Sequence, residues 1–300
     1  MLTELYISRI GFLASMIMLA VLSPSNRVDA QTCDDPVHLR FSMIPTQDID
    51  RDQAYYDPIL FLLSKNTGKK VEMIRPVRNY SSIINGLREN WIDIAFLGPV
   101  SYLLARDQGA IIEPFAALSR RAVGIQAAGS GYHSVLITRK GSAFTSIESL
   151  KGSTLALVDK ASTSGFAIPQ TVFPKETGIS PLKDYFSRII LTGKHDLSIQ
   201  AVIEGKADAA FVGSHVFMHA VAAGKVRLED VNVLWSSPRL PDHPFVYRGS
   251  LCESIRQIVS ETFLSADQTA EGRKFLENIG ADRMIKAHDS DYDIIRAIAR

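Results

Sequence analysis

The 300-residue sequence has almost no excess of charge of either sign. It contains 33 lysine and arginine residues against 32 aspartate and glutamate residues, which leaves a net charge of +1. A chain with so small a net charge has no overall field that attracts it to nucleic acid or to an anionic membrane. The balance argues against both as partners, and any anion that the protein binds must be held by local groups.

The sequence also lacks a hydrophobic run at its N-terminus that is long enough to cross a bilayer. The run Ile10–Leu22 has about 13 residues, whereas a spanning helix needs about 20. It follows Arg9 and precedes Val28-Asp29-Ala30, which fits the pattern of a signal-peptide cleavage site. We therefore expect residues 1–30 to be a signal peptide, cleaved after Ala30, and the mature protein to be periplasmic. An uncleaved membrane anchor is the alternative.

Cysteine is scarce, with Cys33 and Cys252 the only two in the sequence. Both remain after the expected cleavage, and two cysteines in an oxidising compartment can pair. A disulfide would join the mature N-terminus to the C-terminal region, and closing so long a loop would stabilise the fold by about 5 kcal/mol. Two unpaired buried thiols are the alternative. Attachment of a lipid to Cys33 is a less favoured alternative, because the leucine and small residues that usually precede a lipid-modified cysteine are missing before it.

Common catalytic signatures are missing as well. The sequence contains no hydrolase elbow, Walker loop, CxxC pair or HExxH motif. Asp93 and Asp208 are interpreted as turn or strand-edge residues, and nothing in the sequence places a base beside Cys252. We therefore expect no enzymatic activity and no cofactor.

The sequence does contain a regular alternation of strand-like and helical segments, which indicates an α/β fold. The first series has strands at 39–44, 70–74 and 92–97 and helices at 56–64, 81–89 and 99–106. A second series begins at 132–138. Chain crossings near 129–132 and 236–247 divide the protein into two lobes, residues 31–130 plus 244–300 and residues 131–243. A cleft between lobes joined by two crossings is a natural ligand site.

The strongest local signal is the run Ser162-Thr163-Ser164-Gly165, where a strand gives way to a helix. The start of a helix offers unpaired N–H groups and a partial positive charge, and hydroxyl groups add further donors. Three consecutive hydroxyl residues exceed the needs of one helix cap. The run therefore predicts an anion site, with an ordinary cap as the alternative.

At this point the sequence resembles the phosphonate and phosphite solute-binding proteins of ABC importers, within the type II periplasmic binding fold. Each matching segment alone is weak evidence for this family, but the order and spacing of all the segments together are specific to it. They occur in the order Phe41-Ser42-Met43-Ile44-Pro45-Thr46, Asn79-Tyr80, Ile92 to Tyr102, Gly131 to Ile137, Ser162 to Gly165, Gly193-Lys194-His195-Asp196 and Leu234 to Pro238.

The resemblance implies both a fold and a set of ligand-binding residues. It implies two α/β lobes that close over an oxyanion, which is then delivered to the permease subunits of an importer. The positions that match the family's oxyanion ligands are Tyr80, Tyr132, Ser162, Thr163, Ser164 and His195. Hydroxyl groups, backbone N–H groups and one imidazole can together surround an anion with donors. We expect the protein to be a monomer.

The sequence departs from the family at two positions. Relatives that bind aminoalkylphosphonates meet the ligand's ammonium group with two carboxylates, and the matching residues here are His215 and His243. Two imidazoles cannot replace two carboxylates as a cation clamp. We therefore expect a smaller or more anionic ligand such as phosphate, phosphite or a simple alkylphosphonate, with His215 or His243 donating to it. Asp242 could restore an acceptor if the alignment shifts by one residue.

Other functions stay open on the sequence alone. The same fold could bind an oxyanion such as phosphite, arsenate or arsenite and present its closed form to the periplasmic domain of a membrane histidine kinase. His215 and His219 stand four residues apart, which on a helix puts both on one face and could hold a metal. An enzyme on a similar two-lobed scaffold has the least support.

Overall fold

The structure is a computed structural model that describes residues 33–45, 49–74 and 79–299. The expected signal peptide and Thr46 lie outside these residues. The described residues belong to one compact unit, Cys33–Arg300. Within them, no helix combines the length and the apolar character that crossing a membrane requires.

One lobe is built on a seven-stranded sheet in which the first three strands of the chain run parallel to one another. Strand β1 is parallel to β2 and β3, while β11 runs antiparallel between β3 and β4. The order is β12-β4-β11-β3-β1-β2, with the short β5 paired to β4. The bounds are β1 His38–Met43, β2 Lys70–Met73, β3 Ile94–Phe96, β4 Ile112–Arg120, β5 Gly129–Ser130, β11 Phe245–Arg248 and β12 Ala281–Lys286.

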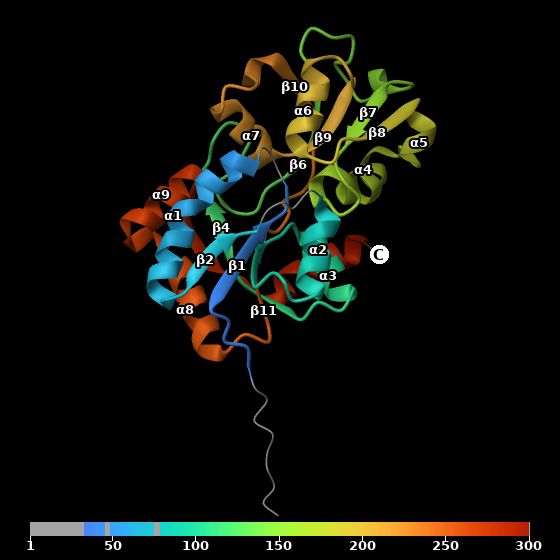
Figure 1. Cartoon of the computed structure of the whole chain (residues 1–300). Coiled ribbons are helices and arrows are strands. Elements are labelled where there is room, and N and C mark those ends of the chain that lie inside the picture. Colours follow the sequence, from blue (N-terminus) through green and yellow to red (C-terminus); the bar gives the residue numbers. More distant parts are fainter. Residues whose placement is uncertain (1–32, 46–48, 75–78, 300) are drawn as a thin grey trace, which may run out of the picture. The chain divides into compact units, whose positions relative to one another are not determined.

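Helices cover both faces of this sheet (Figure 1). One face packs against α1 Ile49–Thr67, α8 Glu253–Leu264 and α9 Ala270–Asn278, and the other against α2 Tyr80–Arg88, α3 Pro99–Asp107 and α10 Asp293–Ala299. Alternation along β1 sends Leu39, Phe41 and Met43 into the first core. Helix α1 is longer than the predicted 56–64, because its first turns carry polar residues that the apolar period does not detect.

The other lobe is built on a five-stranded sheet of order β10-β6-β9-β7-β8. Strand β7 is parallel to β8 and β9, and β6 is antiparallel to β9 and β10. The strands are β6 Ser134–Arg139, β7 Thr154–Leu157, β8 Arg188–Leu191, β9 Ala209–Gly213 and β10 Val231–Ser236. The helices are α4 Ile168–Thr177, α5 Leu182–Tyr185, α6 His195–Ile203 and α7 Ser214–Ala222. Short helical turns lie at η1 Glu148–Leu150, η2 Thr163–Ala167 and η3 Leu228–Asp230, and in the first lobe at η4 Ala266–Gln268 and η5 Asp289–Tyr292.

The chain crosses between the two sheets after β5 and again after β10, and the two crossings are hydrogen-bonded to each other. The N–H of Tyr132 donates to the carbonyl of Leu240 over 3.1 Å, and the N–H of Leu240 donates back over 2.8 Å. The predicted two-lobed α/β architecture is confirmed. The strands of one sheet come from residues 38–130 and 245–286 and those of the other from 134–236; the lobe boundaries between them stay a prediction.

The N-terminal segment is fastened to the first lobe. Cys33 and Cys252 form a disulfide, and the N–H of Cys252 donates to the carbonyl of Asp34 over 3.0 Å. Asp93 lies in the bend that leads into β3, at the strand edge where the sequence analysis expected it, and it is fully buried between Arg40 and Arg248. Burial opposes ionisation there, but hydrogen bonds from the two arginines hold the pKa of Asp93 below its ordinary value.

Candidate oxyanion site

The strand order brings several helix N-termini to one place. A helix that follows a parallel strand starts at the strand's carboxyl end, and ligands in open α/β sheets bind at these ends. Helix α2 follows β2, α3 follows β3, η2 follows β7, α6 follows β8 and α7 follows β9. Tyr80 and His195 are the first residues of α2 and α6, and His215 is the second residue of α7.

The two remaining predicted residues reach the same edges from antiparallel strands. Tyr132 precedes β6, whose first residue, Ser134, pairs with the last residue of β9. His243 precedes β11, whose first residue, Phe245, pairs with Phe96 at the end of β3. The topology therefore places all eight predicted residues at the carboxyl ends of the parallel strands.

Hydrogen bonds between the lobes join two of these helix starts. The backbone N–H of Val100, in the first turn of α3, donates to Thr163 Oγ1 over 2.9 Å. Ser101 Oγ donates to the carbonyl of Ala161 over 2.8 Å. The start of α3 and the start of η2 thus face each other, and the positive ends of their peptide dipoles point into the same region.

The hydroxyl run opens a helix, as the sequence predicted, and the first turn of that helix is a π-helical turn, η2, which α4 follows directly. Single π turns are frequent at functional sites. Ser162 caps the turn, since its Oγ accepts from the N–H of Gly165 over 3.2 Å. Residue 165 is glycine because a Cβ there would lie 2.3 Å from Cγ2 of Val158. Ser162, Thr163 and Ser164 are each only 2% exposed.

His195 presents an N–H group toward this turn. Its Nδ1 accepts from the backbone N–H of Gly213 over 3.3 Å, and its Nε2 lies 3.3 Å from Ser162 Oγ. An N–H group can only donate, so Nδ1 carries the lone pair and Nε2 the proton. Burial, with a smaller effect from His243, lowers the pKa of His195 to about 3. The imidazole is therefore a neutral donor at physiological pH.

Tyr80 and Tyr132 carry the most unusual hydroxyl groups of the site. Both side chains are fully buried, and neither hydroxyl has a hydrogen-bond partner among the described residues. The hydroxyl of Tyr80 faces Ser162, and that of Tyr132 faces Thr163 and Ser164. Burial raises the pKa of both phenols, so both stay protonated and able to donate. A buried polar group without a partner costs about 1–3 kcal/mol, which makes this pair a signal for a ligand.

His215 and His243 pack against Tyr132 and against each other. The three ring centroids are each 4.8 Å apart. Within the described part of the chain, the Nδ1 atoms of both histidines lack a hydrogen-bond partner. Burial lowers the pKa of both imidazoles and Arg120 adds to the effect, while Asp242 opposes the lowering of the His243 pKa without reversing it. Both histidines are therefore neutral.

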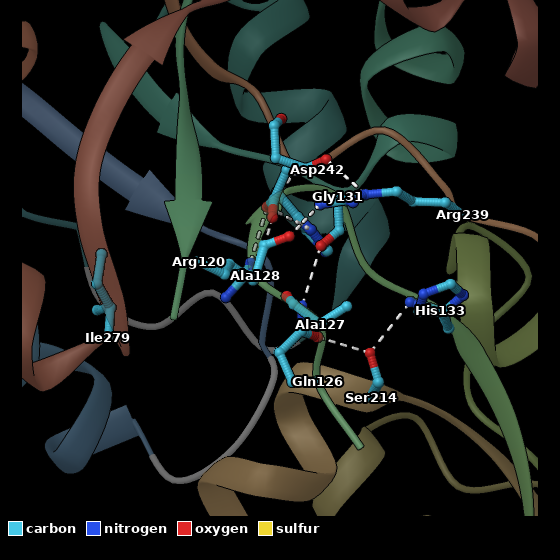
Figure 2. A network of polar contacts seen from close by, with 12 residues as sticks. Arg120, Gln126, Ala127, Ala128, Gly131, His133, Ser214, Arg239, Asp242 and Ile279 are labelled. Atoms are coloured by element: carbon cyan, nitrogen blue, oxygen red, sulfur yellow. Dashed lines mark hydrogen bonds and ion pairs between the residues drawn. The ribbon is translucent and has the colours of Figure 1, made fainter. Parts of the chain in front are cut away.

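The sequence did not point to Arg120, which forms a buried ion pair with Asp242 (Figure 2). Arg120 Nε and Nη2 donate to the two carboxylate oxygens over 2.5 and 2.8 Å. Burial opposes ionisation of Asp242, but Arg120 and His243 hold its pKa at about 2. The carboxylate that the sequence offered as a spare acceptor is thus already occupied. Arg120 is the last residue of β4, and no motif marks that position.

A network around Gln126 stabilises the first crossing (Figure 2). Gln126 Nε2 donates to the carbonyl of Gly131 over 3.0 Å, and its Oε1 accepts from Ser214 Oγ over 2.7 Å. Ser214 Oγ in turn accepts from the N–H of His133 over 3.0 Å. The network ties the segment that carries Tyr132 to the start of the helix that carries His215.

A cavity of about 370 Å³ adjoins the site and is bordered by His215. Side chains of Arg120, Gln126, Met218 and His219 contribute to its wall. His219 lies one helical turn from His215, but its Nε2 is 3.1 Å from the carbonyl of Ile279 in the other lobe. Among the described residues, no group of three histidine, cysteine, aspartate or glutamate side chains is arranged to hold a metal ion. The alternative of a metal held by His215 and His219 therefore gains no third ligand in this part of the chain.

Comparison with known proteins gives a consistent result. A family model for the periplasmic substrate-binding proteins of phosphonate ABC transporters matches residues 41–292. The phosphonates-binding periplasmic protein of Escherichia coli K12 is 28% identical, over 91% of this chain and 78% of its own length. A phosphate-import protein of Mycolicibacterium smegmatis is 25% identical, over 94% of this chain and 91% of its own.

A solved structure adds the fold. The binding-protein component of an ABC phosphonate transporter from Pseudomonas aeruginosa is similar with a TM-score of 0.79 and 26% identity, covering 88% of this chain and 86% of that one. The resemblance drawn from the ordered motifs is confirmed. The family match spans most of the sequence, including the helix starts and both crossings described above, and the chain belongs to the periplasmic substrate-binding proteins of phosphonate ABC transporters.

Proposed function

We propose that this protein captures a small phosphonate-, phosphite- or phosphate-like oxyanion between its lobes and hands it to the permease subunits of an ABC importer. One observation carries the proposal. The hydroxyls of Tyr80, in the seven-stranded lobe, and of Tyr132, in the first crossing, have no hydrogen-bond partner among the described residues, and both face the same hydroxyl-bearing turn, Ser162–Ser164. A ligand that accepts from both hydroxyls would remove the cost of burying them.

The electrostatics of the site favour an anion held by neutral donors. Arg120 is compensated by Asp242, and the buried side chains of His195, His215 and His243 are neutral. Positive potential comes instead from the helix starts and from their free N–H groups. Donors of this kind pair with oxyanion oxygens without requiring a lysine or arginine in contact with the ligand.

Capture and delivery would follow from contacts to both lobes. Tyr80 belongs to the seven-stranded lobe, and Ser162–Ser164 and His195 belong to the five-stranded lobe. A ligand bound by both sets stabilises the closed arrangement relative to the open one, so its arrival shifts the population toward closure. The closed form is the state that a permease would recognise. Reversible binding, with no covalent step, is sufficient for this role, and we propose no enzymatic activity.

The proposal includes a preference within the ligand class. His215 and His243 surround Tyr132 with neutral rings, and neither offers a negative charge to an ammonium group. Phosphate, phosphite and simple alkylphosphonates therefore fit better than aminoalkylphosphonates.

Residues 1–30 would direct export, and the protein would act as a monomer. The family points away from the sensor alternative, since the family model and the relatives above are components of transport systems.

A ligand panel tests the proposal on the mature chain. Thermal unfolding is measured with phosphate, phosphite, methylphosphonate, arsenate and sulfate, with chloride at the same ionic strength as the control. Ligands that bind the native state raise Tm in proportion to saturation. We expect the phosphorus oxyanions to raise Tm and chloride to leave it unchanged. The absence of a shift with every phosphorus oxyanion would reject the proposed function.

A further inference from the structure

His243 lies at the centre of a ring of titratable groups. The residues that face it from the neighbouring elements are Arg120 of β4, Tyr132 of the first crossing, His195 of α6, His215 of α7 and its own neighbour Asp242. Phe96 covers one side of the imidazole, with stacked ring centroids 5.3 Å apart. Which nitrogen of His243 carries its proton is therefore decided by these groups and not by solvent.

The carboxylate of Asp242 is held in one orientation. Arg120 binds both oxygens, and Oδ1 also accepts from the backbone N–H of His243 over 2.7 Å. Both side chains of the ion pair are almost fully buried, at 3% exposed for Arg120 and 0% for Asp242. A carboxylate fixed by two donor groups cannot turn away from the imidazole beside it.

This fixed carboxylate selects the tautomer of His243. Nδ1 lies 3.5 Å from Asp242 Oδ1, which is outside regular hydrogen-bond geometry but close enough for a strong electrostatic effect. A lone pair on Nδ1 would face the negative oxygen, whereas an N–H group is attracted to it. Since a neutral imidazole carries one proton, Nε2 is left with the lone pair. Tyr132 does not donate to it, because among the described residues its hydroxyl has no partner.

We propose that His243 Nε2 accepts a hydrogen bond from a P–OH group of the ligand, so that the site selects singly protonated oxyanions over those without a proton. The inference rests on the proposed function and reverses the donor role first expected for this residue. Arg120 and Asp242 act as positioning residues that set the acceptor. The ligand class is then the monoanion of a phosphonate or phosphite, or a phosphate that still carries a P–OH group, and sulfate is excluded because it has no proton to donate.

A pair of matched ligands tests the hydrogen bond apart from the charge. Methanesulfonate has nearly the shape of methylphosphonate and the charge of its monoanion, but it lacks a hydroxyl. Calorimetry of the mature chain at about pH 6 should give a Kd for methanesulfonate at least about 100-fold weaker, since a buried acceptor is left without a donor and the hydrogen bond is lost as well. Affinities within threefold of each other would overturn the inference.

The pH profile gives an independent test. The second pKa of phosphorus oxyanions lies near neutrality, at about 6 for a phosphate ester. If the monoanion is bound, Kd for methylphosphonate rises about tenfold per pH unit above the ligand's own second pKa. If the dianion is bound, affinity instead grows until that pKa is passed and then stays constant, and this result would also overturn the inference.

A variant assigns the effect to His243. His243→Leu should bind methylphosphonate weakly and lose most of the discrimination against methanesulfonate, while His38→Leu, at an exposed position at the start of β1, should keep it. If His243→Leu does not fold, the ¹⁵N shifts of the wild-type imidazole decide, because they distinguish a protonated from an unprotonated Nε2. Failure of the proposed function would appear differently, as no binding of methylphosphonate at any pH.

Discussion

The side chain of Thr163 accepts a hydrogen bond from the backbone N–H of Val100, and this 2.9 Å contact joins the two lobes at the helix starts of the proposed anion site. Thr163 therefore serves two roles. It stabilises the closed arrangement, and it stands beside the hydroxyl of Tyr132.

Thr163→Ala should weaken binding of phosphorus oxyanions by about tenfold or more without unfolding the protein. The variant loses a ligand donor and leaves the N–H of Val100 unpaired in the closed form, at a cost of about 1–3 kcal/mol. Thr163→Ser, which keeps the hydroxyl, is the matched control. Calorimetry measures the affinity and thermal unfolding the stability. Unchanged affinity in the alanine variant would remove the hydroxyl turn from the site.

Tyr80→Phe should lower affinity while leaving the ligand-free protein as stable as before or slightly more stable. The hydroxyl is buried, and the described residues provide no partner for it, so its removal relieves an unpaired polar group in the absence of ligand. Tyr185→Phe is the control, because that hydroxyl donates to the carbonyl of Ile147 over 2.9 Å within the five-stranded lobe. Urea unfolding and calorimetry together separate the two effects. A destabilised variant with normal affinity would assign Tyr80 to the core alone.

The ligand-free protein should lose stability as the pH falls below 6.5. Burial lowers the pKa of His219 to about 4 and that of His195 to about 3, from an ordinary value of 6.5. Between the lowered pKa of each histidine and pH 6.5, the unfolded chain binds more protons than the folded one. The free energy of unfolding therefore rises with pH in this range. Each such histidine contributes about 1.4 kcal/mol per pH unit.

Urea denaturation at a series of pH values measures this slope. His219→Gln keeps a donor for the carbonyl of Ile279. Between pH 6.5 and about 4 it should reduce the slope of the free energy of unfolding against pH by the contribution of one histidine, about 1.4 kcal/mol per pH unit. The exposed His38→Gln variant is the control for loss of an imidazole. A slope that does not change in His219→Gln would show that this residue titrates normally.

Reduction of the disulfide should destabilise the protein without changing its affinity. Cys33 and Cys252 are 219 residues apart in sequence, and closing so long a loop contributes about 5 kcal/mol in the chain-entropy model. Cys252 caps α8, which contributes no residue to the anion site. The urea midpoint should fall in dithiothreitol, and methylphosphonate should bind as before. A large change in affinity would mean that the N-terminal segment communicates with the site.

An ammonium group on the ligand should weaken binding. We expect 2-aminoethylphosphonate to bind at least about tenfold more weakly than methylphosphonate, because His215 and His243 offer no negative charge to an ammonium and its burial is costly. His215→Glu should shift the preference toward the aminoalkyl ligand. Competitive calorimetry compares the two ligands on each variant. Tight binding of 2-aminoethylphosphonate by the wild type would show that the substitution argument is wrong.

Much of the fold could be predicted from local patterns, since strands and helices bury apolar faces of characteristic period. The prediction was least accurate where tertiary contacts override the pattern. The first turns of α1 carry no apolar period, and Asp93 is an acidic residue that only two distant arginines allow to be buried. Neither feature can be recovered from neighbours in the sequence.

The sequence by itself determined the types of group available for binding: three consecutive hydroxyl residues after a strand, two tyrosines, and several histidines. It could not determine how these groups meet, because they lie more than 150 residues apart along the chain, from Tyr80 to His243. Only the tertiary structure decided that, by stacking the carboxyl ends of parallel strands so that the helix starts converge. It also decided which nitrogen of His243 carries a proton, because Arg120 orients Asp242 from a strand 122 residues away. Tautomers and partnerless hydroxyls depend on distances in space, and a linear pattern of residues does not contain them.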